Sequence, residues 1–538
     1  MAAYMAASIT LGALRIVEFT VSNWDLGIFQ QALWTTAHGQ LFYESGNWES
    51  SGDTSFLQVH PAPILYLVVP VYAAFPAPLT LTVVQSIVVA FAAVPLYRIG
   101  TVLLGDRRIA VGICILYLAW APILTSSNYD FHLEAFIPTE LLTLFWFWLS
   151  ERYLLGFVAA TAAFLTLEVT PFLVAALALY FLLDPGVRLR AKGASAPPAT
   201  PPPPIIQRVR GALRGRAARY SLGLLAASAV AYAALRLFEW WLLPAFLGTP
   251  PHPPSGSGSL LGAATGAGLP FNLDVAAFWQ KKLEYWVLLV GLLGFLPLCA
   301  PRALILVAPW FLFSLQSSQL YWSVLGYQYG FLPAAPLILA AVLGVEPFRR
   351  VVLPRLQEMA RSTTRGRLDV DRMRLRRPFR RVTPARAAGA MLAVLVVANL
   401  YLTPVNPLQQ HLNSPLSGYR VSYQVAPGFT AVATAVALIP SGAPVLASDD
   451  LFPFVANSRE AYSLYWTPQQ PVYLPFNASA LPEYVLLSSD QQFAVPPWLW
   501  PNLANETTYG VVASVWSTPV GTVYLWELHY RGAPIYEG

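Results

Sequence analysis

Asp25 is the first residue of the chain whose type and position could support catalysis. It lies in the segment 23–34, directly after an apolar stretch. Within this segment Trp24, Ile28 and Phe29 fall on helical spacing, which predicts an amphipathic helix lying on a membrane surface. Asp25 could cap this helix, because Asp is a preferred N-cap residue. It could equally accept a proton as a general base, and the sequence leaves both roles open.

A second group of ionisable residues occupies a short polar segment between two later apolar stretches. Asp130, His132 and Glu134 alternate along it, so in an extended backbone their side chains would project to one side. Carboxylate and imidazole groups placed in this way could hold a divalent metal ion or bind sugar hydroxyls. The spacing is not a specific metal signature. A plain structural turn, in which Asp130 starts a helix and Glu134 is solvated, is the alternative.

Three further ionisable residues, His60, Glu140 and Glu168, lie inside or beside apolar segments. Burying such groups in a membrane is expensive, so each is a functional candidate. Glu168 falls at the tip of a predicted tight helical hairpin, where it should face a polar cavity. It could instead be a buried structural carboxylate paired with Arg15 or Arg236.

A few basic residues are candidates for binding the phosphate of a lipid. They are Arg15 within the first apolar stretch, Arg236 before Glu239, and the adjacent pair Lys281 and Lys282. The two lysines could instead extend their ends to the membrane surface while their stems stay in lipid. Aromatic residues nearby should form the membrane-interface belt and could also stack on sugar rings; they are Trp279, Trp286, Tyr321, Trp322, Tyr327 and Tyr329.

Composition indicates that these residues are positioned by elements within a lipid bilayer. Hydrophobic residues make up 56% of the chain, charged residues only 11%, and the mean hydropathy is +0.52, which excludes an ordinary soluble protein. Helices are expected, because a helix satisfies its own backbone polar groups in hydrocarbon. The predicted fold is an all-α polytopic membrane bundle of about eleven spans: 2–20, 79–104, 108–126, 133–150, 154–167, 169–183, 220–238, 284–300, 303–317, 327–345 and 386–404.

The distribution of Lys and Arg predicts how the bundle is oriented. Of the 33 basic residues, 21 lie in two loops, 184–219 and 346–386, which should therefore be cytoplasmic. The net charge of +6 reflects this topology and does not indicate a nucleic-acid partner. The N-terminus is then cytoplasmic and the loop 21–61 external. The tail from 405, with eight acidic and three basic residues, is external as well.

The chain is expected to comprise a transmembrane domain, 1–404, and an extracytoplasmic domain, 405–538. Short β-rich runs predict a small α/β fold for the second domain: 444–447, 484–488, 511–516 and 522–528, the last two joined as a hairpin. Asn477 and Asn505 each begin a glycosylation acceptor triplet. Segment 61–75 is apolar but short and bracketed by proline, which predicts a re-entrant or interfacial piece rather than a span.

Several common chemistries have no support in the sequence. Cys114 and Cys299, the only cysteines, both fall in apolar runs, so neither a disulfide framework nor a thiolate metal site is indicated. No nucleotide-binding loop, dinucleotide fingerprint, zinc-protease helix or nucleophile elbow is present. The first apolar stretch lacks a basic flank and a cleavage site, so we interpret it as a span rather than a signal peptide.

The polar segments together resemble a largely archaeal family of uncharacterised membrane proteins, domain of unknown function twenty seventy-nine. The matching segments, in family order, are 24–34, 38–39, 60–66 and 131–135, followed by 327–339, 447–451 and 483–487. The resemblance covers nearly the whole chain. The chain departs from the family pattern at Gln30 or Gln31, where an acidic residue is common, at Leu133, where the family has Pro, and at 167–169, where it has Lys-Glu-Asp.

The family is similar in plan to the C superfamily of membrane glycosyltransferases, which use polyprenyl-phosphate sugars and carry an essential Asp early in the first external loop. The resemblance implies an inverting sugar transfer to an extracytoplasmic acceptor, with Asp25 as the general base. Arg15, Arg236 or Lys281 would stabilise the departing lipid phosphate. Asp130, His132 and Glu134 would position the acceptor or a divalent ion. The predicted substrate-binding set is completed by His60, Glu168 and Lys282.

Two other classes of function remain as alternatives. A transporter or lipid flippase would use Glu168 and Glu140 on a proton or ion pathway. A non-catalytic membrane anchor would present the C-terminal domain to partners at the cell surface. The transferase predicts that Asp25→Asn abolishes function, whereas the transporter predicts a stronger loss at Glu168.

Overall fold

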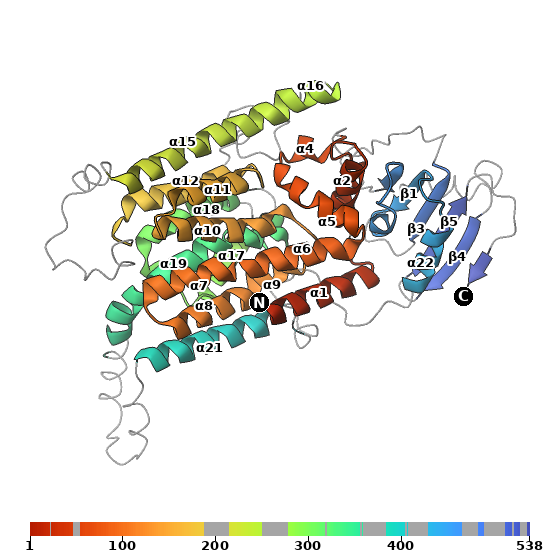
Figure 1. The fold of residues 1–538 in the computed structure, drawn as a ribbon. Coiled ribbons are helices and arrows are strands. Elements are labelled where there is room, and N and C mark those ends of the chain that lie inside the picture. Colours follow the sequence, from red (N-terminus) through yellow and green to blue (C-terminus); the bar gives the residue numbers. More distant parts are fainter. Residues whose placement is uncertain are drawn as a thin grey trace, which may run out of the picture.

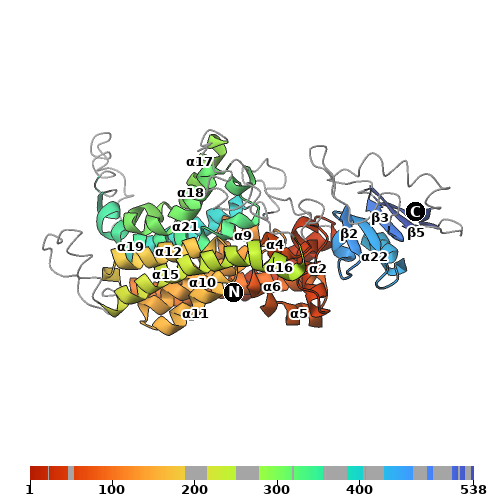
Figure 2. The same cartoon turned by 90° about the horizontal axis from the view of Figure 1, so that it is seen from above.

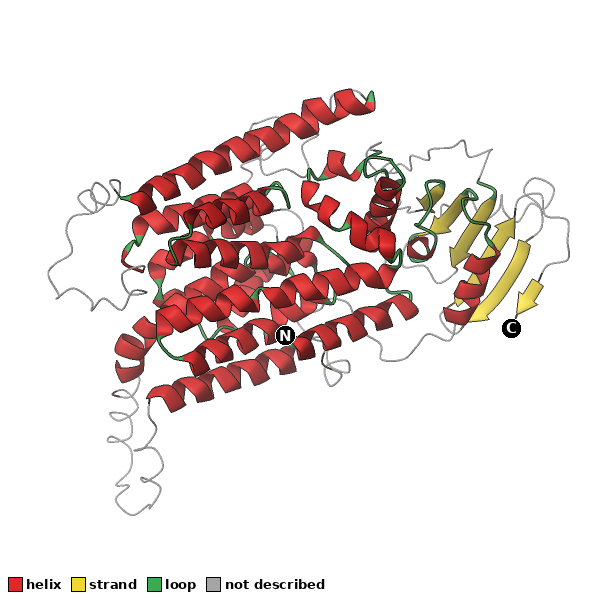
Figure 3. Ribbon diagram, viewed as in Figure 1, coloured by secondary structure: helices red, strands yellow, loops and turns green. Residues whose placement is uncertain are grey.

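The computed structural model consists of a helical bundle with a small β-sheet at one end (Figure 1). It describes residues 1–21, 23–46, 54–187, 215–249, 278–317, 320–355, 358, 384–403, 406, 429–464, 482–488, 512–518, 521–527 and 535–537. Helices form the bundle, and the strands lie in the C-terminal part of the chain (Figure 3). The acceptor triplets at Asn477 and Asn505 and most of the two Arg-rich loops lie outside the described residues.

Short elements follow the first helix, α1 (Ala2–Val17). A π-helical turn (Asn23–Gly27) continues into α2 (Ile28–Ala37); α4 (Phe56–Val59), a 3-10 turn (Pro63–Leu67) and α5 (Val69–Ala74) come next. The predicted amphipathic segment is therefore helical. Segment 61–75 forms only the 3-10 turn and the six-residue α5, which are too short to cross a bilayer at about 1.5 Å of rise per residue.

Further helices, most of them longer, make up the rest of the described bundle. They are α6 (Pro78–Phe91), α7 (Ala93–Leu104), α8 (Arg107–Ala119), α9 (Ala121–Ser127), α10 (Ile137–Leu149), α11 (Tyr153–Phe164), α12 (Thr170–Leu183), α15 (Arg216–Leu237), α16 (Leu243–Leu247), α17 (Trp279–Gly291), α18 (Ala308–Gln316), α19 (Ala334–Pro347) and α21 (Pro384–Leu402). Pro78, Pro138 and Pro171 stand in the first turns of α6, α10 and α12. Proline is favoured there because a first-turn amide has no helical acceptor.

Irregular turns join several of these helices. They are the 3-10 turns Leu133–Phe136, Leu296–Cys299, Pro301–Leu306, Leu320–Ser323 and Gln328–Phe331, and the π-helical turns Phe238–Leu242 and Phe348–Val352. The turn Leu133–Phe136 leads into α10, and the turn Gln328–Phe331 leads toward α19. Both bring polar or aromatic side chains to the site described below.

Three helices in the described part of the chain are long and apolar enough to cross a membrane: Pro78–Leu104, Arg216–Leu247 and Gln328–Arg355. The pair Arg107–Ala119 and Ala121–Ser127, bent by 45°, makes a fourth if it is counted as one span. The predicted count of about eleven spans is not confirmed. Helices do form within each predicted range, but bends and 3-10 turns keep many of them short.

The C-terminal part forms a six-stranded mixed sheet in the order β2-β1-β3-β5-β4-β6. Its strands are β1 (Val445–Ser448), β2 (Ala461–Leu464), β3 (Tyr484–Ser488), β4 (Val512–Thr518), β5 (Gly521–Glu527) and β6 (Ile535–Glu537). β1 runs parallel to β2 and β3, and β5 runs antiparallel to β3 and β4. The predicted hairpin is confirmed as β4–β5. The short strands β2 and β6 were missed.

Separate hydrophobic cores stabilise the bundle and the sheet. Trp120, Trp148 and Trp310 are among the largest fully buried side chains in the bundle. The second core lies between the sheet and α22 (Phe429–Leu438), where Val432 and Ala435 pack with Leu525. Figures 1 and 2 both place the sheet beyond the end of the bundle that carries α2 and α5.

Candidate active site at the end of the helical bundle

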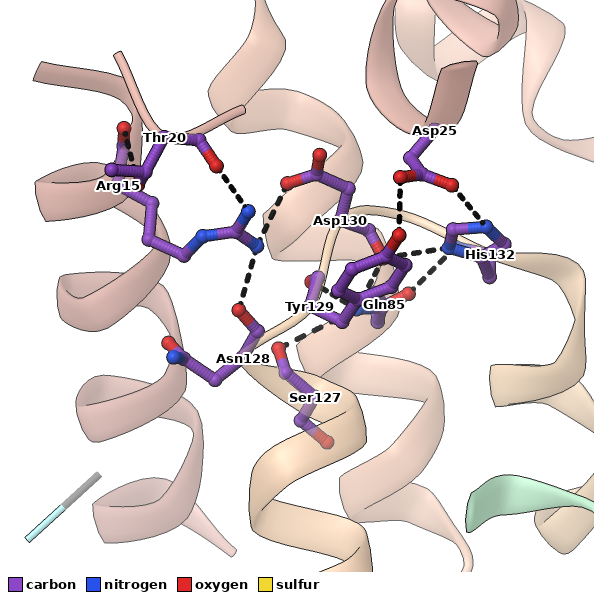
Figure 4. Close-up of polar contacts among 9 residues, drawn as sticks. All are labelled: Arg15, Thr20, Asp25, Gln85, Ser127, Asn128, Tyr129, Asp130 and His132. Atoms are coloured by element: carbon purple, nitrogen blue, oxygen red, sulfur yellow. Dashed lines mark hydrogen bonds and ion pairs between the residues drawn. The ribbon is translucent and has the colours of Figure 1, made fainter. Parts of the chain in front are cut away.

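A buried turn between α9 and α10 carries several site residues, and Gln85 on α6 holds its backbone. The Gln85 carboxamide oxygen accepts a hydrogen bond from the His132 amide at 2.8 Å, and Nε2 donates to the carbonyl oxygens of Tyr129 and Asp130, each at 3.3 Å. Figure 4 shows these contacts around the turn. Sequence reasoning missed Gln85, although an amide inside the apolar run 79–104 was a usable signal.

Arg15 forms an ion pair with Asp130 beside this turn. The Arg15 Nη1 atom lies 2.8 Å from Asp130 Oδ1 and also donates to the carbonyl oxygen of Asn128 at 2.7 Å, while Nη2 donates to the carbonyl of Thr20. Arg15 is only 2% exposed, so a lipid phosphate cannot reach it. The expected phosphate role of Arg15, and its expected pairing with Glu168, are therefore corrected. Arg15 instead ties the end of α1 to the turn.

Asp25 makes two contacts to the same turn. One carboxylate oxygen accepts a hydrogen bond from the Tyr129 hydroxyl, and the other lies 3.1 Å from His132 Nε2 (Figure 4). Asp25 lies inside the first helical turn, Asn23–Gly27, and not at the N-cap position that its alternative role required. Tyr129 directly precedes Asp130 in the polar segment, but it was not among the predicted site residues.

His132 is held in its doubly protonated form. Its Nδ1 atom lies 3.0 Å from the carbonyl oxygen of Asp130, so both ring nitrogens face acceptors. A neutral imidazole could donate to only one of them. Burial alone would lower the pKa of His132, but the hydrogen bond and charge of Asp25 raise it to about 9. The Asp25 carboxylate therefore lies beside an imidazolium.

The predicted metal set, Asp130, His132 and Glu134, does not converge on one point. Asp130 turns to Arg15, and His132 turns to Asp25. No group of three or more His, Cys, Asp or Glu side chains among the described residues could hold a metal ion. The prediction relied on alternation in an extended segment, but the Arg15 cation draws Asp130 away from the other two residues.

A second ion pair, between His60 and Glu168, lies near Asp25 and His132. His60 Nδ1 lies 3.2 Å from Glu168 Oε1, at the connection between α11 and α12. Burial alone would raise the pKa of the Glu168 carboxyl, but the charges of His60 and Arg236 hold it below its usual value. Arg236 is buried and pairs with Glu239. The sequence had suggested Arg236 as a partner of Glu168 and had not considered His60.

A cavity of about 300 Å³ brings these groups together. Five predicted site residues line it, and they come from four separate segments: Asp25, His60, His132, Glu134 and Glu168. Four aromatic residues, Trp310, Phe313, Trp322 and Tyr329, form another part of its wall. Phe313 and Trp322 stack with their ring centroids 4.2 Å apart. Sequence reasoning selected Trp322 and Tyr329 and missed the other two.

The remaining candidates lie elsewhere. Lys281 is half-exposed, pairs with Glu284 at 3.0 Å and lines a separate cavity of about 400 Å³ together with Tyr321 and Tyr327. Lys282 is 2% exposed and donates to the carbonyl oxygen of Leu315 at 2.9 Å, so its end does not reach a membrane surface. Glu140 accepts a hydrogen bond from Thr166 at 2.6 Å and does not line the first cavity.

The apolar helices and this cavity define a membrane protein with a carboxylate-rich site near one end of its bundle. The chain belongs to the family described as predicted membrane protein (DUF2079), whose model matches residues 15–507. This confirms the family indicated by the sequence. No curated protein matches the chain.

Two solved structures of ArnT from Cupriavidus metallidurans are similar to this chain. The structure in the apo state is 16% identical, covers 98% of this chain and 98% of that chain, and gives a TM-score of 0.41. The structure bound to undecaprenyl phosphate is 14% identical, covers 96% and 97%, and gives a TM-score of 0.44.

Proposed function

We propose that this protein is a membrane glycosyltransferase that moves a sugar from a polyprenyl-phosphate donor to an acceptor on the extracytoplasmic side. The observation that carries the proposal is the Asp25 carboxylate, which lines the cavity while Tyr129 and His132 fix its orientation. A general base must be ionised and held within reach of the proton that it removes. The His132 cation favours the ionised form of Asp25, and the Tyr129 hydroxyl restricts its rotation.

The proposed step is a single displacement at the anomeric carbon of the sugar. The acceptor hydroxyl gives its proton to Asp25 while its oxygen bonds to the anomeric carbon. The bond from that carbon to the phosphate oxygen breaks, and its electron pair leaves with the phosphate. Attack from the side opposite the phosphate inverts the centre. A weak base is sufficient, because the reacting carbon has oxocarbenium character and the proton leaves as the new bond forms.

The other cavity residues supply binding groups in this scheme. Glu134 and Glu168 offer carboxylates that can accept hydrogen bonds from sugar hydroxyls. Trp322 and Tyr329 provide aromatic surfaces on which a sugar ring can stack. Arg236 is buried, pairs with Glu239 and does not line the cavity, and Lys281 lies at the other cavity. Among the described lining residues, His60 and His132 are the side chains that can carry positive charge beside a departing phosphate. In this scheme the site and the C-terminal domain lie on the extracytoplasmic side.

The experiment compares the glycans of a host strain that lacks the gene with those of strains complemented by wild type, Asp25→Asn or Glu284→Gln. Mass spectrometry of extracytoplasmic glycans and lipid-linked sugars is the readout. Wild type and the Glu284→Gln control should restore a glycan that Asp25→Asn does not, although all three chains accumulate to the same level in the membrane.

Two outcomes would contradict the transferase. One is a glycan profile that does not depend on the gene at all, which an anchor would give. The other is full restoration by Asp25→Asn together with loss in Glu168→Gln, which an ion-coupled transporter would give. A product with retained anomeric configuration would contradict the single displacement but not the transfer itself.

A further inference from the structure

The helical segment 23–37, which carries Asp25, has two functional faces. Asp25, Ile28 and Phe29 line the cavity, and their i, i+3, i+4 spacing places them on one side of the helix. Gln30 and Gln31 lie on the other side, and both are fully buried. A buried amide must find partners for its donor and acceptor groups. The amide nitrogens of both side chains donate to backbone carbonyl oxygens of the C-terminal domain, the described residues between 429 and 537.

Gln31 forms four hydrogen bonds. Its Nε2 group donates to the carbonyl oxygens of Ser458 and Ala461, at 2.9 and 2.8 Å. Its Oε1 atom accepts from the amide and the hydroxyl of Ser45, at 2.8 and 3.0 Å. The Ser45 hydroxyl also lies 2.8 Å from the Ala461 carbonyl oxygen. One uncharged side chain thus fixes the segment before β2 and the loop after α2 to the same point of the Asp25 helix.

Gln30 makes a second contact across the same boundary. Its Nε2 group donates to the carbonyl oxygen of Pro453 at 3.0 Å and to the Tyr72 hydroxyl at 3.2 Å. The Tyr72 hydroxyl donates to Asn457 Oδ1 at 2.7 Å, and the Asn457 amide donates to the carbonyl oxygen of Pro76, also at 2.7 Å. The C-terminal domain is therefore docked on the Asp25 helix and on α5 together.

We propose that the C-terminal domain is a positioning element of the active site: by docking on Gln30 and Gln31, it holds the helix 23–37 where Asp25 meets Tyr129 and His132. Gln31 is the principal positioning residue. It touches neither the cavity nor a reacting group, and it acts through the helix it belongs to. The importance of this positioning for catalysis rests on the proposed function. The dependence of the Asp25–His132 contact on the docked domain does not.

The chemistry of the glutamine side chain provides a selective test. A carboxylate at position 31 could accept from Ser45 but would face the carbonyl oxygens of Ser458 and Ala461 without a proton to donate. The substitution Gln31→Glu should therefore undock the domain when the new carboxyl is ionised and permit docking when it is protonated at low pH. Other ionisable groups on the packed segments are Tyr43, Glu44, Arg459, Glu460 and Tyr462.

Two measurements on the full-length protein in detergent separate docking from positioning. Hydrogen–deuterium exchange of residues 452–464 reports whether the domain is docked. The ring resonances of His132, assigned with His132→Asn, report whether Asp25 remains beside it. In wild type His132 should titrate near a pKa of about 9. In Gln31→Glu, exchange of these residues at pH 7.5 should be faster than in wild type. The pKa obtained from the His132 titration of this variant should lie near the ordinary value of about 6.5.

Gln40→Glu is the matched control. The end of the Gln40 carboxamide lies beside the Arg459 guanidinium, and turning the amide so that its oxygen faces Arg459 lets that oxygen accept from Nε at 3.2 Å, so the same amide-to-acid change at the same boundary adds an attraction. This variant should keep slow exchange and the His132 titration of wild type. Ser45→Ala is a milder second variant, to be used if Gln31→Glu does not fold. It removes one of the donors to Gln31 and should shift both readouts in the same direction.

The proposal fails if exchange in residues 452–464 rises while His132 still titrates as in wild type, since Asp25 would then keep its place without the domain. It also fails if neither Gln31→Glu nor Ser45→Ala changes exchange. Neither result depends on sugar transfer. A protein that passes both tests but transfers no sugar would contradict the proposed function and leave the positioning role standing.

Discussion

His132 Nε2 lies 3.1 Å from Asp25 Oδ1, and this contact joins the segment after α1 to the segment before α10. His132 offers its second nitrogen to the Asp130 carbonyl, and the Asp130 carboxylate pairs with Arg15. The turn between α9 and α10 therefore takes part in two ion pairs. His132 pairs with Asp25 beside the cavity, and Asp130 pairs with Arg15 in the protein interior.

The first prediction concerns stability against pH. His132 is buried, and its pKa is raised to about 9 in the folded protein, against about 6.5 in the unfolded chain. The stabilisation is complete below pH 6.5 and is lost as the pH rises through 9; the shift corresponds to about 3 kcal/mol. The apparent Tm in detergent should fall between pH 7 and 10, and it should fall less in His132→Asn. Identical profiles for the two proteins would contradict the ion pair.

The second prediction concerns Tyr129→Phe. The change removes the hydroxyl that donates to Asp25 but keeps the ring that stacks on His132 at 5.2 Å between centroids. A hydrogen bond to a charged group contributes about 1.5–3 kcal/mol, so the rate of transfer should fall about ten- to hundredfold. Turnover in isolated membranes is the measurement. Tyr97→Phe on α7 is the control, and an equal loss there would indicate a nonspecific effect.

The third prediction concerns the Arg15–Asp130 pair. Both side chains are buried, so Arg15→Met or Asp130→Asn leaves a charge without its partner and should cost about 3–5 kcal/mol. The double variant should cost less than the sum of the two single changes, which a thermal-unfolding cycle would measure. Additive losses would show that the two groups do not interact.

The fourth prediction concerns His60 and Glu168. Burial lowers the pKa of His60, and the charge and hydrogen bond of Glu168 more than compensate, so the pKa is raised overall. Glu168→Gln should therefore move the NMR titration of His60 to lower pH. Glu284→Gln, which alters an exposed pair on α17, should leave it unchanged. An unshifted His60 in Glu168→Gln would mean that the two groups are apart in solution.

The fifth prediction concerns the close approach of the turn Gln328–Phe331 to α9. A Cβ atom on Gly330 would lie 2.4 Å from the Ser126 hydroxyl and 3.0 Å from the carbonyl oxygen of Pro122. Gly330→Ala should displace this turn, which carries Tyr329 of the cavity wall, and should destabilise the protein by about 1–3 kcal/mol. Gly389→Ala, inside α21 with nothing within 4 Å of the added Cβ, should be neutral or slightly stabilising, because alanine favours the helix more than glycine does. Thermal unfolding compares the two.

Part of this site was predictable from the sequence because its residues break apolar runs. Asp25, His132 and Glu168 stood out for that reason, and the cavity brings all three together. Helix positions followed from the same contrast between apolar and polar stretches. The β4–β5 hairpin was predictable because it is local, requiring only two β-rich runs and a short connection.

The pairings could not be predicted, because sequence does not specify which cation meets which carboxylate. Arg15 was a candidate partner of Glu168, yet it lies on Asp130. Gln30 and Gln31 were noted only as departures from the family pattern. Their role depends on carbonyl groups of the C-terminal domain, and backbone carbonyls carry no signature in the sequence.

The contact between Gln31 and Ala461 spans 430 positions of the chain, and this sets an order of events during synthesis. The helix that holds Asp25 leaves the ribosome among the first segments, but its docking partners are translated only after the bundle. The contact cannot form before residue 461 has been made. We therefore expect Asp25 to reach its final position only when translation is nearly complete. Until then the newly made bundle should be inactive.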